Sequence, residues 1–284
     1  TRFVEHQDAS VTQVIEHDVK ADIQRLDCAS PNADPEAFKS GLVRTPFDLT
    51  ADQLLRVGLV TYANDKHELV VVMHHIASDG WSVNLIIADF VAAYSATIKG
   101  HVLEVAEQPR YSDYAHWQKQ WLEEGEDARQ LAYWKANLGD SHPVLELPAD
   151  LQSNQQEYSN GIAVHAIPVT LKAQLNNYAK SQGSTLFAVL MSAWHILLHR
   201  YSGQSDIRVG MPIANRQHTE SQGIVGFFVN TQVIRSELSA AMTLAQVVKV
   251  ITTSLQGAQA HQDLPFEKLV DGLGLERNLN RSPL

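Results

Sequence analysis

A run of apolar residues from Leu69 to Met73 is followed at once by a polar turn and then by a second apolar pattern with different spacing. Five apolar, mostly β-branched positions are too few for a helix, so the run predicts a buried strand. From Trp81 to about Gly100, apolar residues recur every three or four positions, which predicts a buried amphipathic helix. The central pattern is therefore a strand, a turn and a helix.

Two histidines, His74 and His75, stand at the end of this predicted strand. Because side chains alternate along a strand, the two rings are expected on opposite sides of the sheet and are poor candidates to share a metal ion. An isolated histidine beside an apolar run is more often a hydrogen-bonded core residue, and Asp79 is equally suited to cap the following helix. Two histidines, an aspartate and Gly80 within seven residues favour a catalytic turn over these readings.

The remaining pattern predicts a mixed α/β architecture in two halves. The polar run 152–160 is the strongest boundary, so we expect one domain at 1–150 and a second at 151–284. The first half also predicts strands within 1–16 and at 54–62, and helices within 111–138. The second half predicts a strand at 161–168, helices at 170–182 and 184–201, a strand at 206–213 and a helix at 243–260.

Composition narrows the possible functions. The chain has 284 residues, 44% of them apolar, which is enough for two lobes with separate cores. A formal net charge of −10 and the lack of a basic cluster argue against a nucleic-acid partner. No apolar run is expected to span a bilayer, and no signal-like N-terminus is visible. The single cysteine, Cys28, excludes an internal disulfide and favours a cytoplasmic setting.

A second pair of histidines, His195 and His199, is spaced by one helical turn. Such a pair can bind a metal ion when further ligands lie nearby, but the residues between them are apolar and include no glutamate. We therefore expect no metal site.

The turn itself, from His74 to Gly80, resembles the HHxxxDG signature of the chloramphenicol acetyltransferase-like acyltransferases. The longer string MHHIASDGWS is similar to the motif of nonribosomal peptide synthetase condensation domains. Further matches to that family occur in order along the chain: FDL at 47–49, YSDYAHW at 111–117, VGMPIANR at 209–216, VGFFVNTQVIR at 225–235, HQDLPFE at 261–267 and RNLNRSPL at 277–284. Both ends of the chain fall within or beside family motifs, so the resemblance implies a domain truncated at both ends.

The resemblance implies two chloramphenicol acetyltransferase-like lobes that form a V-shaped pseudo-dimer with a channel between them. It implies an enzyme that joins a donor aminoacyl or peptidyl thioester to an acceptor aminoacyl thioester through an amide bond. Both substrates would arrive on the 4'-phosphopantetheine arms of upstream and downstream peptidyl carrier proteins, beside an adenylation domain. No permanently bound cofactor, nucleic acid or membrane is expected, and the wording of the motifs favours an L-configured donor.

Roles for individual residues follow from the same resemblance. His75 would act as general base or as a hydrogen-bonding positioner of the attacking amine, while His74 would be structural. Asp79 would hold the turn through a buried pair with an arginine, and the resemblance leaves open whether that arginine lies in this chain or in an N-terminal stretch outside it. Gly80 would let backbone approach the reacting centre and offer its N–H. The residues expected to line the substrate channel are Ser82, Trp81, Asn230 and Arg216.

Three alternatives stay open at this point. A stand-alone acyltransferase that uses acyl-CoA would share the histidine chemistry, although about two hundred residues follow the signature here. A catalytically inert condensation-like recruitment domain or fragment is the second, against which the intact His75, Asp79 and Gly80 argue. An epimerisation domain is the third, and the chain lacks the HHxxxDxxSW continuation of that class.

Overall fold

The computed structural model describes residues 1–8, 10–16, 19–102, 109–148, 161–275 and 283–284. Two compact units can be distinguished: residues 1–113 with 216–228, and residues 114–215 with 229–284. This division differs from the predicted boundary at residue 150, and the predicted polar run 152–160 lies outside the described residues. The boundary moves because residues 114–138 form helices that pack into the core of the second unit, and residues 216–228 in turn pack with the first unit.

The first unit is built around a three-stranded sheet in the order β3 (Ile23–Asp27), β4 (Leu55–Ala63) and β5 (Lys66–Met73). β3 and β4 are parallel, whereas β4 and β5 form an antiparallel hairpin, with Leu55 opposite Met73. A separate hairpin joins β1 (Arg2–Glu5) to β2 (Val11–Val14).

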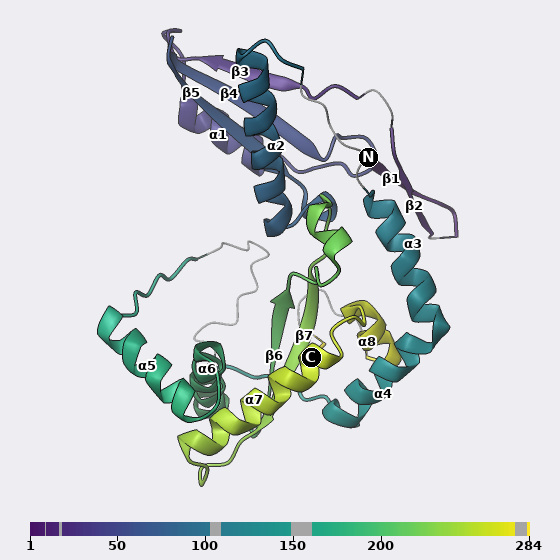
Figure 1. Ribbon diagram of the computed structural model, residues 1–284, viewed down its shortest axis with the longest axis vertical. Helices are drawn as coiled ribbons and strands as arrows, with labels where there is room; N and C mark the ends of the chain where they lie inside the picture. Colours follow the sequence, from purple (N-terminus) through teal and green to yellow (C-terminus); the bar gives the residue numbers. More distant parts are fainter. Residues whose placement is uncertain (9, 17–18, 103–108, 149–160, 276–282) are drawn as a thin grey trace. The chain divides into compact units, whose positions relative to one another are not determined.

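Helix α1 (Pro35–Arg44) lies against β4 and β5 (Figure 1). Asp34 caps its first turn by accepting the Ala37 N–H, and Pro35 stands at the position where a missing N–H costs nothing. The close approach depends on Gly58, because a Cβ at that position would lie 2.4 Å from a Leu42 methyl carbon. At Gly58, the missing side chain leaves the space that Leu42 and Phe38 of the helix occupy.

The predicted strand, turn and helix are present as β5, the 3₁₀ helix η1 (His75–Ala77) and α2 (Gly80–Ile98). The predicted burial is wrong. Leu69 and Val71 of β5 are about 40% exposed, and Ser82 is the one buried residue of α2. An amphipathic pattern gives a helix one apolar face, but burial also needs a partner, and no described helix or strand packs extensively along α2.

By length and composition, α2 is apolar enough to cross a membrane, with a mean hydropathy of 1.3 over its best window. The expectation that no apolar run reaches this length is therefore wrong for Gly80–Ile98. The helix also carries Asn84 and Asp89, and its first turn is fixed by the buried polar contacts described below. These features favour a helix that belongs to the folded first unit.

The second unit contains the two-stranded antiparallel sheet of β6 (Asp206–Ile213) and β7 (Asn230–Glu237), with α7 (Leu244–Ala260) beside β7 (Figure 1). Helices α5 (Val169–Ser181) and α6 (Leu186–Ser202) pack against each other. The predicted strand at 161–168 is absent: Ile162 and Val164 are almost fully exposed, and a β-branched segment forms a strand only when another strand pairs with it.

Helix α3 (Tyr111–Trp121) continues through the π-helical turn η2 (Leu122–Glu126) into α4 (Asp127–Leu138). The second unit also contains α8 (Phe266–Gly272), while the 3₁₀ helix η3 (Thr219–Gly223) belongs to the segment that joins the first unit. The main core of the second unit is built from α4, α6, α7, α8 and the two strands. Its fully buried members include Leu138, Ile207, Ile234, Ile251 and Leu269.

Candidate active site

The turn after β5 gives His74 and His75 different environments. His74 is half-buried, its N–H donates to the Leu54 carbonyl at 3.0 Å, and its Nδ1 accepts the Ile76 N–H at 3.0 Å. Its ring also meets Phe47 edge-on, with 5.7 Å between the ring centroids. These contacts tie His74 to the backbone of the turn, as a structural role requires.

His75 begins η1 and its side chain is exposed. Nδ1 lies 2.9 Å from the Ser78 carbonyl oxygen. Because a carbonyl only accepts hydrogen bonds, the neutral ring is assigned the tautomer with the proton on Nδ1. The Nε2 lone pair has no hydrogen-bond partner among the described residues, so it is available to accept a proton from a bound molecule. The ring meets Phe227 edge-on at 5.8 Å.

Asp79 caps α2 and is the centre of a buried polar network. Oδ1 accepts the N–H and the hydroxyl of Ser82 at 2.8 and 2.7 Å, and Oδ2 accepts the Phe228 N–H at 3.1 Å. Nη2 of Arg216 lies 3.0 Å from each carboxylate oxygen. Asp79 is only 2% exposed, so its charge is balanced inside the protein.

The pKa of Asp79 is set by opposing effects. Burial raises the pKa, since it disfavours the charged carboxylate, but hydrogen bonds from Ser82, Phe228 and Arg216 favour that form. The net result is a pKa below the ordinary value, so Asp79 is ionised at neutral pH.

The arginine partner of Asp79 is Arg216, from the segment that joins the first unit, and not a residue of an N-terminal stretch. Its side chain is 1% exposed. Nη1 donates to the carbonyl oxygens of Ser221 and Ile224, and the guanidinium lies 3.9 Å from the centre of the Phe228 ring. With its guanidinium enclosed in this way, Arg216 does not line a substrate channel as predicted.

Ser82 is also enclosed, with 0% exposure. Besides donating to Asp79, its hydroxyl oxygen accepts the Gly226 N–H at 3.1 Å and a bond from Arg216 at 2.9 Å. Ser82 therefore joins the start of α2 to residues 216–228, and the prediction that it lines the channel is corrected.

Trp81 and Gly80 remain accessible at the start of α2. Trp81 is 43% exposed, and its indole N–H donates to the Gln222 carbonyl at 2.9 Å. A Cβ at Gly80 would meet nothing within 4 Å, so packing among the described residues does not require glycine there. The Gly80 N–H lies in the first turn of α2, where backbone N–H groups lack intrahelical partners.

Asn230 lies in the second unit and is 9% exposed. Its Nδ2 donates to the carbonyl oxygens of Gln262 and Leu264 at 2.8 Å each, and its Oδ1 accepts the Phe266 N–H at 3.0 Å. All of these bonds go to the HQDLPFE stretch. Asn230 therefore holds that loop, which replaces its predicted role in lining the channel.

His195 and His199 each make a hydrogen bond through Nδ1 within the second unit. His195 Nδ1 lies 2.8 Å from the Ser236 hydroxyl, while His199 Nδ1 lies 2.6 Å from the Gln204 carbonyl oxygen. Among the residues that the structure describes, no three His, Cys, Asp or Glu side chains are grouped so as to hold a metal ion.

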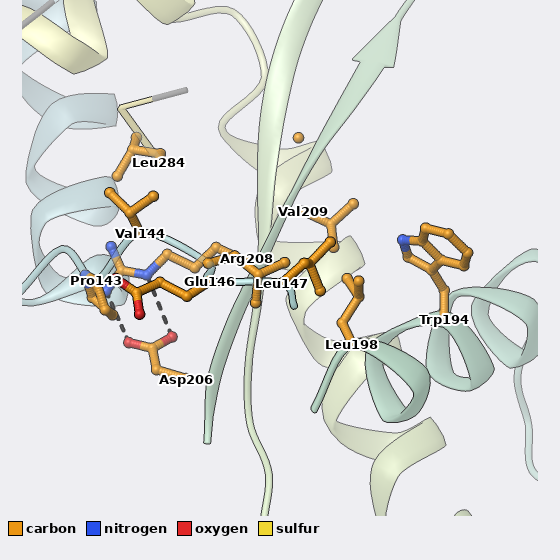
Figure 2. A pocket seen from close by; sticks show the side chains of 12 residues that line it. Pro143, Val144, Glu146, Leu147, Trp194, Leu198, Asp206, Arg208, Val209 and Leu284 are labelled. Carbon is orange, nitrogen blue, oxygen red and sulfur yellow. Dashed lines mark hydrogen bonds and ion pairs between the residues drawn. The ribbon is translucent and has the colours of Figure 1, made fainter. Parts of the chain in front are cut away.

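A cavity of about 700 Å³ lies in the second unit, beside β6 and α6 (Figure 2). Two of its charged side chains are paired with each other: Arg208 donates to Asp206. Arg208 also donates to the carbonyl oxygens of Leu138 and Ser141, and Asp206 also accepts from Arg235. Burial raises the pKa of Asp206, but the hydrogen bonds from Arg208 and Arg235 outweigh burial. The net pKa lies below the ordinary value. These contacts hold the chain after α4 against β6.

Two further residues near His75 were not selected from the sequence. Phe227 contacts the imidazole, and the hydroxyl of Tyr111 donates to the Phe227 carbonyl at 2.7 Å. Both belong to motifs on which the resemblance rests, but their contacts join positions 116 apart in the chain. The adjacent Gly226 between bulky residues is the one local signal of a close approach.

Comparisons with known proteins give matches over almost the whole chain. The family model described as "Condensation domain" matches residues 1–284. A linear gramicidin synthase from Brevibacillus parabrevis is 41% identical over 98% of this chain, which spans 4% of that synthase.

Solved structures give the same result for the fold. The X-domain from teicoplanin biosynthesis matches 99% of this chain and 64% of its own length, with a TM-score of 0.84 and 26% identity. The condensation domain from the monacolin K polyketide synthase matches 97% of this chain and 64% of its own, with a TM-score of 0.78 and 24% identity. The predicted α/β fold, of the chloramphenicol acetyltransferase-like type, is thereby confirmed.

Proposed function

Because this chain belongs to the condensation-domain family, we propose that it forms amide bonds in nonribosomal peptide biosynthesis. The donor is an aminoacyl or peptidyl thioester and the acceptor an aminoacyl thioester, each carried on the 4'-phosphopantetheine arm of a peptidyl carrier protein. The chain spans only a few per cent of its curated relatives, so the carrier and adenylation domains belong to the proposal.

One observation supports this proposal most directly. The exposed His75 imidazole keeps its Nδ1 proton on the Ser78 carbonyl and leaves the Nε2 lone pair without a partner among the described residues. An imidazole with a free ring nitrogen at an accessible position can act as a general base. Because the His75 ring is already exposed, the turn does not have to open for a substrate to reach it.

The proposed step needs no protein nucleophile, because the thioester is already activated. The acceptor α-amine attacks the donor carbonyl carbon, so that the C–N bond forms and the C–S bond breaks. His75 Nε2 takes the proton that the nitrogen loses, and the departing thiolate of the donor arm takes up that proton to become a thiol. The Gly80 N–H is the candidate donor to the carbonyl oxygen. Holding both tethered groups in place supplies much of the remaining rate enhancement.

Asp79 and Arg216 take no part in proton transfer in this proposal, because both are enclosed. Their ion pair fixes the first turn of α2, and with it the Ser78 carbonyl that sets the tautomer of His75. In this proposal the exposed His75 ring reacts, and the buried Asp79–Arg216 pair holds the turn that carries it.

The test uses the full-length protein that carries this chain, with carrier proteins loaded with defined aminoacyl groups. We expect His75→Ala to reduce the rate of dipeptide formation by about 100-fold or more, the usual contribution of a general base. His101→Ala, an exposed histidine beyond α2, is the control and should be active. Undiminished product from the His75 variant would remove this residue from the mechanism.

The same assay separates the other functions. Equal rates with a free acyl-CoA donor would indicate a stand-alone acyltransferase. A wild-type protein that forms no product from any loaded pair would indicate a recruitment role, in keeping with the 26% identity to the teicoplanin X-domain, which has been solved in complex with OxyB. Parallel reactions with L- and D-configured donors test the proposed preference for the L form.

A further inference from the structure

We propose that Tyr111 is a positioning residue for the His75 imidazole and acts on it through Phe227. The proposal rests on the role of His75 described above, since it concerns how that ring is held. It assigns the aromatic residue at the start of α3 a part in the rate of the reaction.

The His75 ring needs a second support because the turn gives it only one. The hydrogen bond to the Ser78 carbonyl fixes the position of Nδ1. It does not stop an exposed ring from swinging about that bond or from leaving it for another rotamer. Phe227 meets the ring edge-on, with 5.8 Å between centroids and an interplanar angle of 75°, and so limits this motion.

Phe227 is itself held through the peptide unit that follows it. Its carbonyl oxygen accepts the Tyr111 hydroxyl at 2.7 Å. The next N–H, that of Phe228, donates to the buried carboxylate of Asp79 at 3.1 Å. The peptide unit that follows Phe227 is therefore fixed at its oxygen by Tyr111 and at its nitrogen by Asp79.

The Tyr111 ring occupies the space that a side chain at position 226 would fill. A Cβ on Gly226 would lie 2.2 Å from Cδ2 of Tyr111. The same ring meets Phe228 edge-on at 5.1 Å. The backbone at Gly226 and the ring of Phe228 thus fit against the Tyr111 ring. This packing fixes the backbone at Phe227 and therefore the direction in which its side chain leaves it.

Packing alone does not account for a tyrosine here. A phenylalanine would fill the space over Gly226 and meet Phe228 equally well, whereas the hydroxyl adds a hydrogen bond to Phe227. That bond ends on the residue that touches the catalytic imidazole. The geometry therefore couples the hydroxyl to the orientation of His75.

The test replaces Tyr111 with phenylalanine in the full-length protein, which keeps the ring and removes the hydrogen bond to Phe227. We expect kcat for dipeptide formation to fall by about 10-fold, as a small misplacement of a reacting group does. KM for both loaded carriers should stay unchanged, since Tyr111 is not proposed to contact either substrate. Tyr62→Phe is the matched control: Tyr62 donates to Glu68 at 2.7 Å in the same unit, away from the turn, and its loss should leave kcat unaltered.

A second readout observes the ring directly. In protein with ¹⁵N-labelled histidine, the His75 ring nitrogens of the wild type should show one tautomer, whereas Tyr111→Phe should broaden them or mix the two forms. Phe227→Leu should produce the same spectrum and a larger loss of kcat. An unchanged kcat in Tyr111→Phe, or a loss of kcat with an unaltered His75 spectrum, would overturn the proposal. A wild type without product would refute the proposed function, and the spectra would still test the positioning.

Discussion

The carboxylate of Asp79 illustrates how much a single buried charge requires. It is 2% exposed and accepts hydrogen bonds from two backbone N–H groups, one hydroxyl and one guanidinium. With this many donors, the charged form is stable although burial opposes it. Removing the charge while Arg216 remains would leave an unbalanced cation inside the protein.

We therefore expect Asp79→Asn to lower the free energy of unfolding by about 3–5 kcal/mol, the usual cost of breaking a buried pair from one side. Glu123→Gln is a matched control, because Glu123 pairs with Lys119 at 3.9 Å on an exposed surface. Exposed pairs contribute about 0–1 kcal/mol. Urea unfolding of both variants measures the difference, and equal midpoints would show that the buried pair is not a major source of stability.

His195 is the second residue whose environment makes a measurable prediction. It is 0% exposed, its Nδ1 bonds to the Ser236 hydroxyl, and its Nε2 is buried without a partner in the described residues. Burial lowers the pKa of His195 to about 4. The ring is therefore neutral in the folded protein at pH values where an unfolded chain already binds the proton.

The sign of the pH effect follows from this depressed pKa. Between pH 6.5 and about 4 the unfolded state binds more protons, so stability is complete above pH 6.5 and falls as the pH drops. The loss reaches on the order of 3 kcal/mol by pH 4.

Asn is expected to keep the bond to Ser236 but cannot titrate, so His195→Asn should be less stable at pH 7 yet lose less stability on acidification. Unfolding free energies at pH 7 and 4.5 test this, with the exposed His101→Gln as control; parallel losses would exclude His195.

At the scale of elements, the turn between β6 and residues 216–228 depends on one unusual backbone conformation. Asn215 has a φ of +51°, the one positive φ of a non-glycine residue in the described parts of the chain. Asparagine tolerates this left-handed region better than other side chains do. The residue that follows is Arg216, so this turn sets the direction from which the guanidinium reaches Asp79.

We expect Asn215→Gly to be nearly neutral and Asn215→Val to lower the free energy of unfolding by about 1–2 kcal/mol, the cost of forcing a β-branched residue into the left-handed region. Thermal and urea unfolding of the two variants provide the comparison, and each serves as the control for the other. Equal stability of the valine and glycine variants would show that the turn relaxes without cost.

Elements also show how far a sequence determines this fold. The strand, the histidine turn and α2 follow from local patterns, because apolar spacing and capping residues act within a few positions. The burial of α2 and the absent strand at 161–168 do not, since both depend on whether another element packs there. Local periodicity predicts which face of a segment is apolar, but it does not predict whether another element packs against that face.

The site shows the same limit. His75 was identified from its neighbours in sequence, whereas the Asp79–Arg216 contact spans 137 positions and no local pattern predicts it. The residues expected to line a channel, Ser82, Arg216 and Asn230, proved to be buried polar residues that hold backbone in place.

At the scale of the whole molecule, the main feature is that residues 216–228 belong to the first unit although both of their flanks belong to the second. Three backbone N–H groups, those of Ser82, Gly226 and Phe228, donate into the network of Asp79 and Ser82. The position of residues 216–228 therefore depends on the Asp79–Arg216 ion pair, whereas β6 and β7 are held by their own backbone hydrogen bonds.

Hydrogen exchange should resolve this dependence. In Arg216→Gln, we expect exchange at Ser82, Gly226 and Phe228 to accelerate by about tenfold or more, because the local network opens more readily. The amides of β7 and α7 in the second unit serve as internal controls and should exchange at the wild-type rate. Uniform acceleration across both units would mean instead that the substitution destabilises the entire chain.

The crossing of residues 216–228 has a consequence for recombination between related synthetases. A chimera that joins the first half of one parent to the second half of another would have Asp79 from the first parent and Arg216 from the second. Asp79 and Arg216, on the two sides of the histidine turn, would then come from different parents. Grafts that carry residues 216–228 along with residues 1–113 of the same parent should preserve the turn, and those that cut after residue 113 alone should not.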